Sequence, residues 1–227
     1  MFHGGANGNE PPIRVLQGPK TLLSAVDNVA VDAVHDEIYT ASYVTDSILV
    51  YRRLANGDEA PIRILHGPKT NLDRPIRVEV DPINNLMAVV TDHAIAVYNR
   101  TDQGDVAPKW VISGPKTGVG TRFGTRDVKL FPEGKKIIAG GSLRGREARS
   151  AESSTGEQEF RGGQRFLAVW EYGDNGDVAP WAILNSTPTT KIPGGRLALN
   201  AEGGDLIAGG DGQVSVYHVP EVFKRTK

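Results

Sequence analysis

The 227-residue chain carries 26 Lys and Arg against 27 Asp and Glu, a formal net charge of −1 that excludes a global attraction to nucleic acid or to an anionic membrane. The absence of cysteine excludes a disulfide framework, a thiolate metal site and a cysteine nucleophile. No apolar run reaches the roughly 20 residues of a membrane helix, so we expect no membrane insertion.

The first residues show no basic start followed by an apolar stretch, so no signal peptide is visible. As written, the chain is expected in the cytoplasm. A missing leader would instead direct it to the periplasm or out of the cell.

One phrase recurs along the chain. It contains a turn, a proline, an apolar run and a second turn, and its copies begin at Ala6, Ala55, Asp102 and, more faintly, Asp174. The aligned prolines are Pro12, Pro61, Pro108 and Pro180, spaced by 49, 47 and 72 residues. The last spacing exceeds the one before it by 25 residues and predicts one insertion in a regular array.

Within each period, apolar runs of four to seven residues alternate with turns rich in Gly, Pro, Asn and Asp, which is typical of β-strands. No stretch has a helical period that competes with this pattern. In chain order, the predicted strands are 13–18, 28–33, 36–42, 47–53, 62–67, 76–82, 86–92, 94–100, 109–114, 126–132, 136–142, 166–172, 181–186, 195–201, 205–211 and 213–219.

Four strands in a period of about 45 residues indicate the blade of a β-propeller. The pattern "VDPxNNxxAVxT…AIxVYxR…NGDxAPxRxIxGPKT" resembles bacterial NHL-like β-propeller repeat proteins over nearly the whole chain. The resemblance implies an all-β propeller of four blades, each with four antiparallel strands, in a single domain over 1–227 with an insertion at 142–165 in the third blade. It also implies a protein that acts as an interaction platform.

The order of strands predicts how the propeller closes. The chain begins on an outer strand, 12–18, and ends after a third strand, 214–218, so the N-terminal strand is expected to complete the last blade. We favour a closed ring formed by one chain. A dimer of two chains forming an eight-bladed ring is the alternative.

The repeated turns contain one candidate for binding. Asn-Gly-Asp supplies the positive φ of a tight hairpin turn, and one Asp per loop is too sparse for a calcium site. In Gly-Pro-Lys-Thr the glycine and proline bend the chain, whereas Lys20, Lys69 and Lys116 recur without a geometric reason. They are either solvated turn residues or a basic rim for an anionic group or an acidic partner.

Two further features point to the face that carries the crossover loops. The polar insertion 142–165 contains Arg144, Arg146 and Phe160 and is either disordered or a partner-binding segment. The residues that open the inner strands, Asn28, Arg77, Asp127 and Arg196, should gather around the central channel. They are channel-lining structure, or Arg77 and Arg196 bind an anion. Glu79 and Lys129 are expected to form an ion pair between blades.

No catalytic constellation is visible, and we expect neither a metal nor a cofactor. The five histidines occupy different places in the repeat, and the channel cations disfavour a dication. Aromatic residues at the ends of the third strands, Tyr51, Tyr98, Tyr172 and Tyr217, are interpreted as packing between blades. The expected function is a non-enzymatic binding scaffold for a protein partner. A small anion or a glycan remains an alternative ligand, and a metal-dependent hydrolase or lyase and a lectin remain alternative functions.

Overall fold

The computed structural model describes residues 2, 4–119, 125–143, 164–185, 191–193, 195–210 and 212–224. The described strands form four antiparallel sheets, each built from strands that follow one another in the chain. The first sheet contains β1 (Val26–Asp32), β2 (Glu37–Ser42), β3 (Ser47–Arg52) and β4 (Arg63–His66), and the second contains β5 (Arg77–Asp81), β6 (Leu86–Val90), β7 (Ile95–Asn99) and β8 (Trp110–Ile112). The third contains β9 (Thr125–Phe131), β10 (Lys136–Leu143), β11 (Gln164–Glu171) and β12 (Ala182–Asn185), and the fourth contains β13 (Arg196–Asn200), β14 (Asp205–Gly210) and β15 (Gln213–His218). Three short 3-10 helices are η1 (Pro19–Thr21), η2 (Pro68–Thr70) and η3 (Pro132–Gly134).

The sheets pack face to face as the blades of a propeller, with inner strands β1, β5, β9 and β13 side by side in that order. Successive side chains of a strand point to opposite faces, so each blade contributes apolar residues to the boundary before it and to the boundary after it. Val78 of β5 packs in one core with Tyr39 and Val50 of the first blade. Val128 and Leu197 occupy the same place at the next two boundaries. The predicted all-β propeller of four blades is therefore confirmed.

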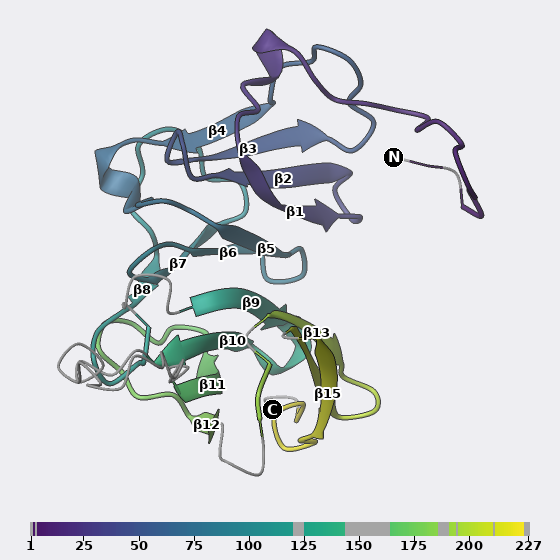
Figure 1. The fold of residues 1–227 in the computed structure, drawn as a ribbon. Coiled ribbons are helices and arrows are strands. Elements are labelled where there is room, and N and C mark those ends of the chain that lie inside the picture. Colours follow the sequence, from purple (N-terminus) through teal and green to yellow (C-terminus); the bar gives the residue numbers. More distant parts are fainter. Residues whose placement is uncertain are drawn as a thin grey trace, which may run out of the picture.

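The predicted closure is not found among the described residues. The fourth sheet contains only β13, β14 and β15, and the segment before η1 is bonded to the first blade instead. Gly57 N–H donates to the carbonyl of Val15 at 2.7 Å, and Gln17 N–H donates to the carbonyl of Gly57 at 3.0 Å. In Figure 1 the blades follow an arc, with the N end beside the first blade and the C end beside the fourth.

The long interruption of the repeat lies between β10 and β11. These strands stay paired through Ser142 opposite Arg165 and Leu143 opposite Gln164, so pairing extends two residues into each end of the predicted insertion.

Among the helices of the described residues, none has the length and apolar character that a membrane span requires.

Candidate functional site

The crossover turns place the three predicted lysines at equivalent, exposed positions. In each turn the backbone N–H of the lysine donates a 2.7 Å hydrogen bond to an aspartate carboxylate in a loop of the blade that follows. The pairs are Lys20 with Asp58, Lys69 with Asp105, and Lys116 with Asp177. The aspartate of the repeated Asn-Gly-Asp motif therefore bonds to the preceding crossover turn. From the sequence this motif was interpreted only as a tight turn.

The glycine of each crossover turn is required by this contact. Gly67 has φ 131°, and a Cβ added there would lie 2.5 Å from Oδ1 of Asp105. Gly18 and Gly114 show the same conformation and the same close approach to their aspartates. The turn is thus explained by backbone and carboxylate, while the lysine side chains remain exposed to solvent.

The residues that open the inner strands lie at equivalent places, as predicted, and each bonds across a blade boundary. Oδ1 of Asn28 accepts from Val78 N–H at 2.7 Å, and Oδ2 of Asp127 accepts from Leu197 N–H at 2.8 Å. The guanidinium groups in the other two blades donate to backbone carbonyls of the blade before, Arg77 to Asp27 at 3.0 Å and Arg196 to Arg126 at 2.9 Å. Arg77 and Arg196 therefore act at different boundaries, and the described contacts do not bring them onto one anion.

Acidic groups between the second and third blades are paired with cations. Nζ of Lys129 lies 2.9 Å from Oε2 of Glu79, which confirms the predicted ion pair. Nε of buried Arg77 lies 3.9 Å from Oδ1 of Asp127. Burial raises the pKa of Glu79 and of Asp127 above their ordinary values, and Lys129 offsets part of each increase.

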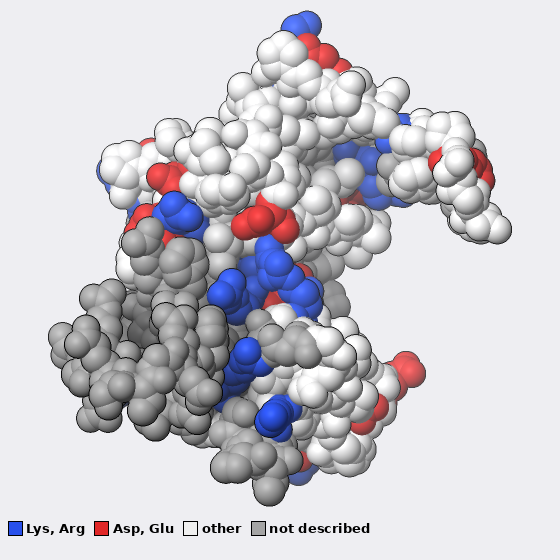
Figure 2. Space-filling view, in the orientation of Figure 1, with Lys and Arg blue, Asp and Glu red and all other residues white. Residues whose placement is uncertain are grey.

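Cationic side chains gather beside this boundary on the surface of the third and fourth blades, as Figure 2 shows over β9 and β13. Thr125 and Phe166 both lie opposite Gly141, so Arg126 and Arg165 lie at the same end of the third sheet. We define the basic cluster as these two residues with Arg196 and Lys191, which the following contacts bring next to them. Arg126 and Arg196 are exposed and joined by the hydrogen bond above, while Arg165 donates to the carbonyl of Ile192, the neighbour of exposed Lys191. Arg165 lies opposite Ser142 in the pairing of β10 with β11, at the end of these strands from which the interruption begins. The cluster therefore adjoins the predicted binding face.

Three predicted site residues, Arg144, Arg146 and Phe160, lie outside the described residues.

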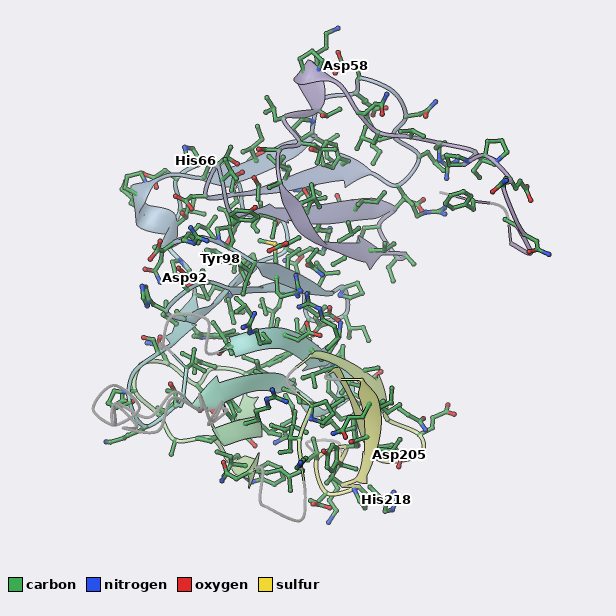
Figure 3. All side chains as sticks on the ribbon, viewed as in Figure 1. Asp58, His66, Asp92, Tyr98, Asp205 and His218 are labelled. Carbon is green, nitrogen blue, oxygen red and sulfur yellow. The ribbon has the colours of Figure 1, made fainter. Side chains whose placement is uncertain are left out.

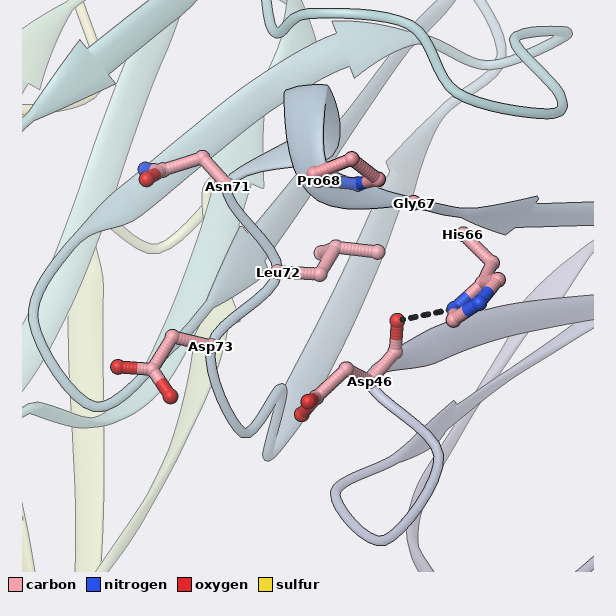
Figure 4. Close-up of a pocket in the computed structure, with 7 residues that line it drawn as sticks. All are labelled: Asp46, His66, Gly67, Pro68, Asn71, Leu72 and Asp73. Atoms are coloured by element: carbon pink, nitrogen blue, oxygen red, sulfur yellow. Dashed lines mark hydrogen bonds between the residues drawn. The ribbon is translucent and has the colours of Figure 1, made fainter.

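A second candidate site is a pocket of about 390 Å³ between the first two blades, at the crossover turn (Figure 4). Two of its polar residues, Asp46 and His66, already take part in hydrogen bonds. Oδ1 of Asp46 accepts from Arg74 N–H at 2.9 Å, and the carbonyl of Asp46 lies 3.3 Å from Nδ1 of His66. The pocket is lined by Asp46, His66, Gly67, Pro68, Asn71, Leu72 and Asp73.

A buried charged cluster that the sequence did not predict lies between the first and second blades. Glu37 receives two hydrogen bonds from Arg63, at 2.8 and 2.7 Å, and one each from Arg100 and Tyr39 at 2.5 Å. Burial raises the pKa of Glu37, but the hydrogen bonds and charges of these partners outweigh it and hold that pKa below its ordinary value. Because Arg100 is far from Glu37 in sequence, only the alignment of blade positions could have suggested their contact.

Two tyrosines of the third strands lie in the core, and Tyr172 does not share their place. Tyr51 and Tyr98 are fully buried and donate to the carbonyls of Thr21 and Thr70, and Figure 3 labels Tyr98. By strand register, Trp170 rather than Tyr172 takes this place in the third blade. Tyr172 instead donates to Oδ2 of Asp81 at 2.8 Å.

In the parts of the chain that the structure describes, no three His, Asp or Glu side chains are grouped so that they could hold a metal ion. Among the described histidines, His35, His93 and His218 each contact a single carboxylate, and Nδ1 of His218 lies 3.1 Å from Oδ1 of Asp205.

Comparisons with known proteins agree with the fold and supply no closer identity. No family model and no curated protein matches the chain. Among solved structures, it is similar to the WD40 β-propeller domain of Doa1, with 11% sequence identity and a TM-score of 0.53. The alignment covers 88% of this chain and 53% of that chain, so this protein spans about half the length of the propeller that it matches.

Proposed function

We propose that the protein is a non-enzymatic binding scaffold that holds an acidic segment of a partner protein on the basic cluster. The observation that carries this proposal is the grouping of exposed cations on one surface of a chain whose net charge is only −1. Glu79 is paired with Lys129, and Asp127 accepts the backbone N–H groups of Val128 and Leu197, so in the described contacts neither carboxylate accepts a hydrogen bond from a side chain of the basic cluster.

Rigidity supports the assignment. Arg126 and Arg196 lie on or beside inner strands whose backbones are bonded to neighbouring blades, so binding orders little backbone. The crossover turns carry a separate basic rim that could steer an acidic partner. The rim consists of Lys20, Lys69 and Lys116.

The repeated phrase also leads us to place the chain with bacterial NHL-like repeat propellers. We call the hydrogen bond from the lysine backbone N–H to the aspartate carboxylate the aspartate clasp. The distinguishing features of that repeat would be the crossover glycine, the aspartate clasp and the exposed lysine.

A fluorescein-labelled peptide with a run of glutamates tests the binding proposal. Arg126→Glu and Lys191→Glu should each weaken binding about tenfold at low salt, because each reverses a charge that faces the peptide. Exposed Lys135→Glu, in the turn after the far end of β9, is the matched control and should change affinity less than about twofold. Fluorescence anisotropy measures the affinity, and thermal melts check that each variant is folded. Absence of peptide binding, or equal losses in all three variants, would contradict the proposal.

A further inference from the structure

The face of the first blade that points away from the second blade is apolar. We call it the leading face. Its part at the inner strand is exposed, whereas Leu49 and Tyr51 are buried beneath Leu16 and Leu23 of the N-terminal segment. Strand register aligns Val29 with Val78, Val128 and Leu197 of the other blades. Val29 is 54% exposed, whereas Val78 and Val128 are 1% exposed, because each of those packs on the blade before it. The leading face is therefore built as a blade boundary, and no preceding blade covers Val29 among the described residues.

The face of the fourth blade that points away from the third shows the complementary feature. We call it the trailing face. Val214 and Val216 are 73% and 61% exposed, while Ile48 and Val50, at the same places in the first blade, are 0% and 2% exposed. Exposed apolar side chains of this kind mark an interaction surface.

The backbone shows the same incompleteness. In the described chain β15 has no outer neighbour. The segment Pro12–Gly18 meanwhile occupies the place of an outer strand belonging to a blade before the first. Leu16 forms a parallel bridge to Gly57, just as Leu65 of β4 does to Gly104 and Ile112 of β8 does to Gly176.

Charge complementarity links the two faces. Inside the molecule, Glu37 at the start of β2 receives Arg63 from its own outer strand and Arg100 from the next blade. By register Asp205 at the start of β14 takes the place of Glu37, and Figure 3 shows it at one end of the fourth blade. In the same alignment Arg14 takes the place of Arg63, and Arg53 takes the place of Arg100. The trailing face thus supplies the acid of this cluster, and the leading face supplies both cations.

We propose that the partner of these faces is a second copy of this chain, and that two copies complete one ring. The leading face of each copy packs on the trailing face of the other, and each N-terminal segment adds to β15 of the other copy. The pairing of β3 with β4 fixes the register, because Ile48 lies opposite Leu65. It places Leu16 opposite Val214 and Val15 opposite Ser215. Coverage of 53% of a WD40 propeller fits two arcs to a ring rather than one.

Cross-linking tests the register directly, because the chain has no cysteine of its own. Val15→Cys combined with Ser215→Cys should form a covalent dimer on mild oxidation, since directly opposed residues of antiparallel strands lie within disulfide reach. Val15→Cys with Gln213→Cys, two positions out of register, and each single variant are the controls and should cross-link much less.

The mass of the oxidised product distinguishes the alternatives. A disulfide within a monomer would mean that one chain closes on itself, and equal cross-linking by the controls would mean that the contact is unspecific. Either result overturns the proposal, as does the absence of any cross-link, which would leave these faces for further blades of another polypeptide.

A charge exchange tests the complementary cluster. Asp205→Arg and Arg53→Asp should each raise the dimer dissociation constant about tenfold or more, because each places like charges together. The two substitutions combined should restore most of the affinity. Circular dichroism confirms folding of each variant. Folded variants that associate like the wild type, or a double variant weaker than both single ones, would contradict the proposal.

Discussion

Glu37 is almost fully buried and joins the second strand of one blade to residues of its own and the next blade. Its carboxylate oxygens are satisfied by Arg63, Arg100 and Tyr39, so ionisation is favoured despite desolvation. The exposed pair of Arg52 with Glu59, at 3.5 Å, lacks this burial and contributes little. Burial therefore decides which ion pairs of this molecule matter for stability.

Glu37→Gln should lower the free energy of unfolding by about 3 kcal/mol at pH 7, because it leaves buried guanidinium groups without their anion. The pKa of Glu37 is lowered on folding, so its stabilisation is present above its ordinary pKa and is lost as pH falls through the folded value. Urea unfolding at several pH values should show wild type and Glu37→Gln converging on acidification. Exposed Glu202→Gln serves as control, and a difference that is constant with pH would contradict the assignment.

At the scale of elements, the crossover turn and the loop of the next blade form a repeated unit. Three turns show the same contact between a lysine N–H and an aspartate carboxylate, and the glycine before each turn makes room for it. The clasp fixes the outer strand of one blade against the next, so it stabilises the boundary rather than a single sheet.

Asp105→Ala should remove the clasp at one boundary and lower stability by about 1 kcal/mol, the net value of one hydrogen bond. The Lys69 amide should then exchange its hydrogen about fivefold faster, while the Lys20 amide is unchanged. Asp58→Ala is the matched control with the reciprocal pattern. Hydrogen exchange followed by NMR measures both amides, and an unchanged Lys69 amide in Asp105→Ala would rule out the clasp.

The positions of these elements could be predicted because the repeat marks each strand with turn residues on both sides. The ion pair of Glu79 with Lys129 could also be predicted, because these residues take the same position on neighbouring inner strands. The Glu37 cluster and the aspartate clasp could not be predicted, since they join residues that the fold alone brings together. The sequence also does not reveal that Trp170, rather than Tyr172, takes the core position of the third strand in that blade.

At the scale of the whole molecule, sequence predicted the blades and not their closure. The N-terminal segment was expected on the fourth blade because that blade lacks an outer strand. In the structure its hydrogen bonds attach it to the first blade, a contact that the interior boundaries repeat. Both expectations are reconciled if the segment bonds to its own first blade and to the fourth blade of a second copy.

Sedimentation equilibrium of the unmodified chain tests this assembly most directly. We predict a species of twice the 24.4 kDa chain mass at micromolar concentration, because the leading and trailing faces cover each other in pairs. A 24.4 kDa monomer at every concentration would contradict the two-copy ring, as would a series of masses that grows with concentration, which would indicate open polymers.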